Sequence, residues 1–187
     1  MNSLIIPSEL IVVTGPARSG KSEWAETLAI KSEKQVIYIA TSQLDSTDQE
    51  WQIRIQKHQE RRPISWEILE VPIDLTVTLE KISSQNTCIL VDSLGTWLAN
   101  LLEQDQITWE TTQNQLLKIL DKLPGTIILV AEETGWGVVP AYPMGRTFRD
   151  RLGGLVRHLG AIANSVYLVT GGYVLNLTQL GSPLRSK

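Results

Sequence analysis

The sequence has little cysteine and no excess of positive charge. Its 187 residues include one cysteine, Cys88, which excludes a disulfide within the chain and a metal cluster of several cysteines. Because Cys88 lies in the apolar run Cys-Ile-Leu-Val, we expect a buried thiol that packs as a small hydrophobe. The net charge of −3 argues against a general nucleic-acid binder, so we expect no nucleic-acid partner.

Long apolar segments are also missing. No apolar run approaches the ~20 residues that a membrane helix requires, so we expect no membrane span. The N-terminus has neither the basic residues nor the small-residue cleavage pattern of a signal peptide. With the single cysteine, these absences predict a cytoplasmic protein. The length and the hydrophobic content of 42% predict a single domain, residues 1–187, with its own core.

What the chain does contain is a series of short apolar runs rich in β-branched residues. Such unbroken runs are typical of parallel strands whose sheet is covered by helices on both faces. We expect these strands at residues 10–14, 36–40, 88–92, 126–130 and 166–170. The run at 173–177 is compatible with an antiparallel edge strand, and the tail from Thr178 is expected to be loosely ordered.

Amphipathic stretches fill the gaps between these runs. Thr47 and Glu50 form a capping-box pattern at the start of one of them. The helices are expected over residues 19–31, 47–61, 94–102, 109–122 and 145–163. Strand and helix therefore alternate along the chain, which predicts an α/β fold with a mainly parallel sheet.

A phosphate-binding loop follows the first expected strand. Residues 15–22 read Gly-Pro-Ala-Arg-Ser-Gly-Lys-Ser, the P-loop pattern, between a strand and a helix as that pattern requires. The glycines let backbone N–H groups converge on a phosphate, and the helix N-terminus adds partial positive charge. Lys21 would contact the β- and γ-phosphates, and Ser22 would bind Mg²⁺. The sequence therefore predicts a P-loop NTPase fold that binds ATP or GTP.

Asp92 is the expected second metal ligand. It ends the apolar run Ile-Leu-Val-Asp, as the Walker B carboxylate does. An alternative role is the N-cap of the following helix, and the two roles are compatible. Because ligands of open α/β sheets bind at the carboxyl edge of the strands, we also expect residues 40–42 and 132–134 to face the site.

Histidine is scarce, with only His58 and His158. In a helix, one face about 100° wide would hold an aromatic ring, an imidazole and several guanidinium groups. These residues are Trp51, Arg54, His58, Arg61 and Arg62. Such a face would suit a nucleotide, and an imidazole there could attack an α-phosphorus. The spacing alone favours a plainer interpretation, an exposed helix whose arginines pair with nearby glutamates. His158 is expected at a helix surface or an interface.

Several collinear motifs resemble those of the bifunctional adenosylcobinamide kinase/adenosylcobinamide-phosphate guanylyltransferase family. The motifs are the P-loop from Thr14 to Ser22 and the segments 38–42, 54–66, 70–72, 91–102, 133–140 and 145–150. They are spread over residues 10 to 177. The P-loop is common to many nucleotide-binding proteins, whereas the histidine segment and the Glu-x-Gly-Trp-Gly segment are specific.

The resemblance implies a RecA-like fold, a homotrimer and a two-step transferase of cobalamin biosynthesis. The enzyme would phosphorylate adenosylcobinamide with ATP or GTP. It would then transfer GMP from GTP to adenosylcobinamide phosphate, releasing pyrophosphate. His58 would carry the GMP as a phosphoramidate, which changes the preferred interpretation of its helix to a nucleophile flanked by phosphate-binding arginines.

The resemblance also implies a set of site residues. The expected catalytic residues are Lys21, His58 and Asp92, and the expected Mg²⁺ ligands are Ser22 and Asp92. The expected nucleotide-binding residues are Gly15, Pro16, Ala17, Arg18, Ser19, Gly20, Lys21, Ser22, Ala40, Thr41, Ser42, Gln59, Glu60, Arg61, Arg62, Glu70 and Asp92. Three positions depart from the family pattern: Glu132 stands where Asn is common, and Gly154 and Val156 replace an Arg and an Asn.

Two other functions remain open from the residues alone. A P-loop kinase for another small alcohol would transfer a γ-phosphate without forming a GMP adduct. A nucleotide-gated switch or assembly protein would bind nucleotide to order a loop and would transfer nothing. The carboxylates Asp92 and Glu133 argue against the switch.

The two histidines allow a matched test of the nucleophile. His58→Ala is expected to abolish the acid-labile, alkali-stable adduct formed from GTP labelled on the α-phosphate, because the attacking nitrogen is removed. His158→Ala should label like wild type. Labelling should also fall below about pH 6.5, since attack requires a neutral imidazole. Equal labelling of His58→Ala and wild type would exclude this nucleophile.

Overall fold

The computed structural model describes residues 8–42 and 62–184, and the structural statements below concern these residues. The elements are, in chain order, β1 (Glu9–Gly15), α1 (Lys21–Lys31), β2 (Gln35–Ala40), β3 (Glu67–Glu70), α3 (Leu75–Ile82), β4 (Thr87–Asp92), α4 (Leu94–Asn100), α5 (Gln106–Leu120), β5 (Thr126–Glu132), α6 (Pro143–Ile162), β6 (Ser165–Thr170), β7 (Tyr173–Asn176) and α7 (Leu177–Leu180).

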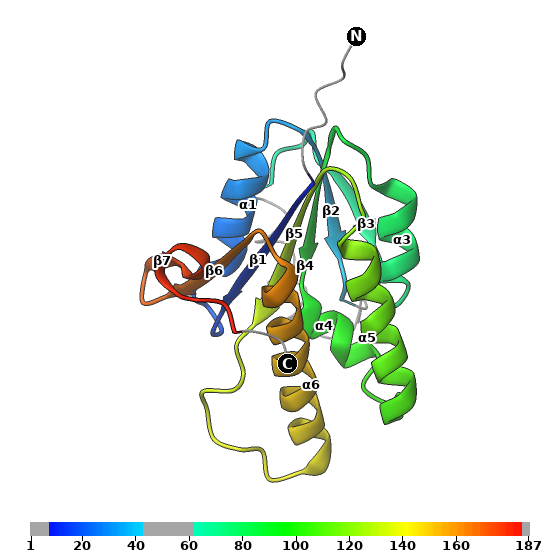
Figure 1. Cartoon of the computed structure of the whole chain (residues 1–187), viewed down its shortest axis with the longest axis vertical. Helices are drawn as coiled ribbons and strands as arrows, with labels where there is room; N and C mark the ends of the chain where they lie inside the picture. Colours follow the sequence, from blue (N-terminus) through cyan, green and yellow to red (C-terminus); the bar gives the residue numbers. More distant parts are fainter. Residues whose placement is uncertain (1–7, 43–61, 185–187) are drawn as a thin grey trace.

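The strands form a single sheet in the order β3-β2-β4-β5-β1-β6-β7. All neighbouring pairs are parallel except β6 and β7, which pair antiparallel. The parallel strands therefore end at one edge, the lower edge in Figure 1. This arrangement confirms the predicted α/β fold. The strand that leads into the P-loop, β1, is separated from the strand that carries Asp92, β4, by β5.

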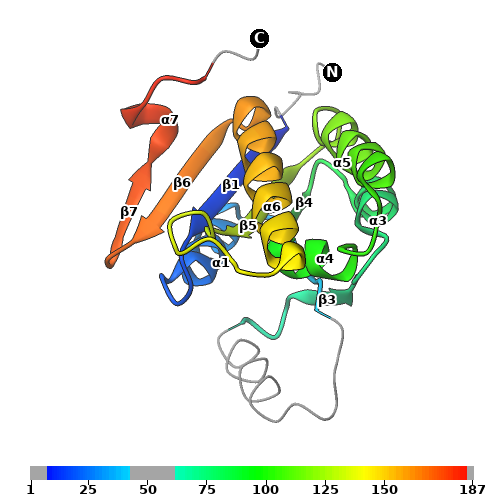
Figure 2. The ribbon, with the colours of Figure 1, turned by 90° about the horizontal axis from the view of Figure 1, so that it is seen from below.

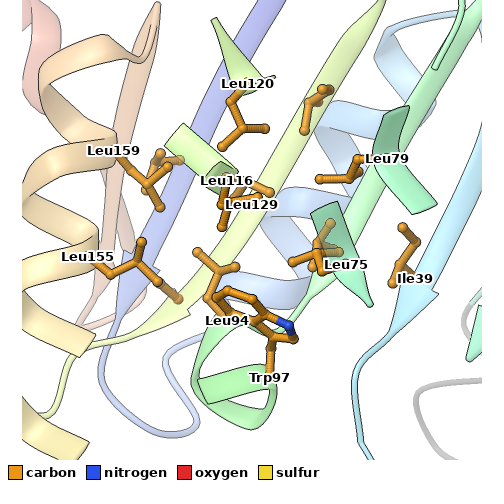
Figure 3. Packing of buried hydrophobic residues seen from close by; sticks show 14 of the residues in the cluster. Ile39, Leu75, Leu79, Leu94, Trp97, Leu116, Leu120, Leu129, Leu155 and Leu159 are labelled. Carbon is orange, nitrogen blue, oxygen red and sulfur yellow. The ribbon is translucent and has the colours of Figure 1, made fainter. Parts of the chain in front are cut away.

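Helices cover both faces of the sheet, and each face has its own apolar cluster. Figure 2 shows α1 on one side of the sheet and α3, α5 and α6 on the other. Ala25 and Ala29 of α1 are completely buried against one face. On the opposite face, buried leucines of α3, α5 and α6 converge on Leu129 of β5, as Figure 3 shows. Because helices cover both faces of the sheet, the side chains of the central strands are buried on either side. This burial explains their unbroken apolar runs.

The five parallel strands predicted from the sequence are present in the structure, and three further elements were not predicted. The edge strand β3 is short and largely exposed, so it lacks the apolar run by which the others were found. Helix α3 reads Leu-Thr-Val-Thr-Leu-Glu-Lys-Ile, and its β-branched residues weaken the helical pattern. The tail from Thr178 was expected to be loosely ordered, and this is wrong for residues up to Leu180, since α7 begins after Asn176 caps it.

Local hydrogen bonds explain where the other elements begin. Helix α1 begins at Lys21, two residues later than predicted, because Gly20 has a φ of 92°. Helix α5 begins three residues earlier than predicted, because the Asp105 carboxylate accepts a hydrogen bond from the Thr108 N–H at 2.8 Å. That bond lowers the pKa of Asp105. The helix predicted over residues 47–61 lies outside the described residues.

Two further expectations are confirmed. Cys88 is completely buried as a free thiol, and burial raises its pKa. His158 is exposed on the surface of α6. Within the described residues, no helix has the length and apolar character needed to span a membrane.

Two glycines provide a matched test of the fold. Gly125 precedes β5 with a φ of 88°, and a Cβ there would lie 2.2 Å from the Ser84 carbonyl oxygen. Gly125→Ala should therefore lower the free energy of unfolding by about 2 kcal/mol or more. Gly153 lies within α6, where a Cβ would meet nothing within 4 Å, so Gly153→Ala should raise stability by about 0.5–1 kcal/mol. Urea denaturation of both variants checks the pair, and equal effects would contradict the geometry.

Candidate nucleotide-binding site

The P-loop connects β1 to α1 at the carboxyl edge of the sheet. Gly15 lies so close to β6 that a Cβ would sit 2.3 Å from the Val169 carbonyl oxygen. Gly20, with its positive φ, turns the chain into α1. These two constraints explain why the pattern requires glycine at both ends of the loop. Between them, Ala17 and Arg18 are exposed.

Polar groups inside the loop are poorly satisfied by the protein itself. Lys21 is 7% exposed, and its ammonium donates to the Pro16 carbonyl at 3.3 Å, within the same loop. Among the described residues, the buried Ser19 hydroxyl has no hydrogen-bond partner. Buried polar groups normally have a partner. A buried cation and an unpaired hydroxyl beside a helix N-terminus therefore fit a phosphate.

Asp92 lies two strands away from the P-loop strand, and its carboxylate is held by Tyr38. The Tyr38 hydroxyl donates to Asp92 Oδ2 at 3.0 Å. Burial, followed by the charge of Asp92, raises the pKa of Tyr38, so the phenol remains protonated and can donate. Pairing register places Ala40 beside both Asp92 and Glu70. These three predicted site residues are therefore neighbours across β3, β2 and β4.

Arg62 packs onto the ring of Tyr38. Its guanidinium lies over the Tyr38 ring, 3.4 Å from the ring centroid, and its Nε is 3.8 Å from Glu26 Oε1 of α1. The Arg62 side chain is only 7% exposed. Arg62 thus joins β2 to α1 in this structure, and its predicted contact with nucleotide stays a prediction.

A second carboxylate, Glu132, organises the turn after Asp92. It accepts hydrogen bonds from the Ser93 hydroxyl and from the Gly95 N–H. Ser93 itself caps α4, since its side chain accepts from the Thr96 N–H. The N-cap is therefore Ser93, and the alternative role of Asp92 as the cap is wrong. Glu132, expected to face the site, is directed at the start of α4.

Thr41 is also turned away from the site. It is completely buried, and its hydroxyl donates to the Ser93 carbonyl and accepts from the Ser93 N–H. The Asn100 amide holds the same segment by donating to the carbonyls of Thr41 and Pro72. The Thr41 side chain therefore fixes the end of β2 against α4. Its predicted contact with nucleotide stays a prediction.

The remaining predicted residues divide into two groups. Ser22 and Ser42 are partly exposed at the carboxyl edge. His58, Gln59, Glu60 and Arg61 lie outside the described residues. The residues that sequence reasoning missed are Tyr38 and Ser93. Tyr38 could have been found from the alternation of side chains along a strand. It lies two residues before Ala40 and so shares its sheet face, and Ala40 pairs with Asp92 on the neighbouring strand.

The donors available to a metal are few. Among the described residues there is no group of three or more His, Cys, Asp or Glu side chains that could hold a metal ion. The chemistry fits a hard divalent cation that keeps several waters and binds substrate phosphates, with one hydroxyl from Ser22 and one carboxylate from Asp92. It does not fit a zinc centre held by protein ligands alone.

Comparison with known proteins places this chain in a family of enzymes. The profile of a family described as cobinamide kinase/cobinamide phosphate guanyltransferase matches residues 11–177. A bifunctional adenosylcobalamin biosynthesis protein of Pseudomonas aeruginosa is 41% identical over 92% of this chain and 98% of its own length. A protein described in the same terms from Escherichia coli is 35% identical over 87% of this chain and 96% of its own length.

Solved structures support the fold alone. A Pyrococcus horikoshii protein has a TM-score of 0.56 at 8% identity, covering 95% of this chain and 94% of its own. An ATPase from the type III secretion system of pathogenic bacteria has a TM-score of 0.52 at 11% identity, covering 92% of this chain and 53% of its own. Both likenesses agree with an α/β fold built on a mainly parallel sheet.

The Tyr38–Asp92 hydrogen bond can be measured by a double-mutant cycle. Tyr38→Phe keeps the ring under Arg62 and removes only the hydroxyl, and Asp92→Asn removes the charged acceptor. Because the bond has a charged partner and is partly buried, we expect a coupling free energy of about 1–2 kcal/mol in urea denaturation. Tyr167→Phe, whose ring contacts Trp24, replaces Tyr38→Phe in the control cycle and should show no coupling. Additive effects of Tyr38→Phe and Asp92→Asn would contradict the hydrogen bond.

Proposed function

The chain belongs to the cobinamide kinase/cobinamide phosphate guanyltransferase family, and we propose that its P-loop edge serves two successive transfers. The first phosphorylates adenosylcobinamide with ATP or GTP. The second transfers GMP from GTP to adenosylcobinamide phosphate, giving adenosylcobinamide-GDP and pyrophosphate. The observation that carries this proposal is the P-loop, with buried Lys21 and unpaired Ser19, on the same sheet edge as Asp92.

In the first transfer, the terminal hydroxyl of the aminopropanol arm attacks the γ-phosphorus. An oxygen–phosphorus bond forms, the bond to the β–γ bridging oxygen breaks, and the nucleoside diphosphate leaves. Lys21 would exchange its contact with the Pro16 carbonyl for the phosphate oxygens on which charge develops. Such positioning and charge stabilisation supply most of the catalysis in phosphoryl transfer.

Mg²⁺ is the divalent ion we propose for this site. Ser22 and Asp92 would hold it together with the β- and γ-phosphates, and it would neutralise charge on the phosphate oxygens. The Tyr38 hydroxyl, which donates to Asp92 Oδ2, would hold this carboxylate in place for the ion.

In the second transfer, we assign the nucleophile to His58. Its imidazole nitrogen would attack the α-phosphorus of GTP, and the bond to the α–β bridging oxygen would break with release of pyrophosphate. A phosphate oxygen of adenosylcobinamide phosphate would then attack the same phosphorus, break the phosphorus–nitrogen bond and restore the histidine. The same proposal includes a homotrimer, which the resemblance of the motifs implies, and a cytoplasmic location, which the single cysteine and the absence of signal and membrane segments predict.

Labelled nucleotides test the two transfers separately. With γ-labelled ATP or GTP, label should move to adenosylcobinamide. With α-labelled GTP, label should appear first on the protein and then, after addition of adenosylcobinamide phosphate, in adenosylcobinamide-GDP with pyrophosphate release. Transfer of the γ-phosphate without any GMP adduct would instead support a kinase for a small alcohol. Nucleotide binding with neither transfer would support a switch.

Two lysines of α1 provide a matched test of the P-loop. Lys21→Met should lower the rates of both transfers by about 100-fold or more, because it removes the cation that contacts the transferred and leaving phosphates. Lys31→Met, at the far end of the helix, removes a lysine whose ammonium lies 5.4 Å from the Trp24 ring centroid. That control should keep both rates close to wild type. A loss confined to one transfer in Lys21→Met would show that the two reactions do not share this loop.

A further inference from the structure

We infer that the loop between β5 and α6, with the first residues of α6, forms the surface that receives the corrin macrocycle of adenosylcobinamide. This inference rests on the proposed function and adds the binding surface for the larger substrate. We call this surface the apolar loop face. Its members are Trp136, Val138, Val139, Tyr142 and Met144.

The apolar loop face is strongly exposed. Val138 is 94% exposed, and Trp136, Tyr142 and Met144 are each more than half exposed. Exposing several large apolar side chains within nine residues costs solvation free energy of about 25 cal/mol per Å². Large apolar side chains exposed together on one loop favour the binding of another molecule.

The exposure is a consequence of how the backbone is held. The Arg146 guanidinium donates to the carbonyls of Pro140 and Ala141, and the Arg149 guanidinium donates to the Gly135 carbonyl at 3.1 Å. Phe148, between these arginines, packs against the core cluster. Two arginines about one turn apart on α6 therefore hold the loop backbone, while its apolar side chains remain in solvent.

The loop begins at the phosphate end of the nucleotide site. The Glu133 N–H donates to the Gly15 carbonyl of the P-loop at 2.8 Å, and the Glu133 carboxylate accepts from the Gly135 N–H at 2.6 Å. Figure 1 shows the loop and the first half of α6 extending past the carboxyl edge of the sheet. A molecule that lies on this face can therefore direct a side arm toward the P-loop.

The chemistry of the substrate matches this placement. Adenosylcobinamide is a large macrocycle with a methyl- and amide-bearing periphery and one arm that ends in the reacting hydroxyl. The nucleotide accounts for the P-loop, so the macrocycle needs a separate surface within reach of the same phosphate. Strand β7 also exposes apolar residues, but as a sheet edge it offers unpaired backbone groups and suits another chain.

The test compares substitutions on the apolar loop face with one on the opposite edge. In Trp136→Ser/Val138→Ser, we expect the KM for adenosylcobinamide to rise about tenfold or more, because apolar contact area is lost. The KM for nucleotide, the GMP labelling of the protein and the thermal unfolding temperature should stay close to wild type. Ile30→Ser is the control, since Ile30 is 56% exposed near the end of α1. It should change none of these quantities.

Each outcome decides the inference. An unchanged KM for adenosylcobinamide in the double variant, with turnover intact, would overturn the apolar loop face and leave the proposed function standing. A change in molecular mass by light scattering, in parallel with the change in KM, would assign this face to contact between copies of the chain and also overturn it. If wild type turned over nucleotide but neither bound nor modified adenosylcobinamide, the proposed function itself would fail, and the inference with it.

Discussion

A carboxylate at the end of a completely buried strand constrains the whole nucleotide edge. Residues Cys88 to Val91 are almost without exposure, and Asp92 follows directly. A charge at such a boundary is costly unless it is hydrogen-bonded. The Tyr38 hydroxyl of the neighbouring strand provides that bond, and the Tyr38 ring in turn supports Arg62. Through this hydrogen bond and the ring contact, Tyr38 joins Asp92 to Arg62.

The side chain of Glu132 fixes the turn after Asp92. The Glu132 carboxylate accepts from Ser93 and Gly95, and a Cβ on Gly95 would clash with it at 2.0 Å. With glutamate in this position at 132, residue 95 must therefore be glycine. The Asn that the motif resemblance implies at position 132 has a shorter side chain, so we expect Glu132 to anchor α4 differently from an Asn. It leaves the contacts of Asp92 with Tyr38 as they are.

The sequence predicted the buried half of this fold and little of its periphery. Strands such as β4 and β5 carry unbroken apolar runs. In contrast, β3 is short and largely exposed, and α3 is short and rich in β-branched residues, so the local pattern does not separate them from loops. In the site, the P-loop was predicted residue by residue because its backbone geometry requires those residue types. The direction of Thr41 could not be predicted, because its hydroxyl bonds to Ser93, 52 positions away in the chain. Hydrogen bonds between such distant segments depend on the order of the strands in the sheet, and the hydrophobic periodicity of the sequence does not reveal that order.

The remaining departures from the family pattern also concern packing. Val156 packs against the core cluster, where an Asn would need a hydrogen-bond partner. A Cβ at Gly154 would meet nothing within 4 Å, so the missing Arg removes a surface side chain and no internal contact. Both positions lie on α6, beyond the arginines that hold the apolar loop face. The groups proposed to bind phosphate are thus fixed by buried strand ends, while the surface proposed for the macrocycle depends on one helix and one loop. Substitutions in α6 should for this reason alter corrinoid recognition before they alter nucleotide binding.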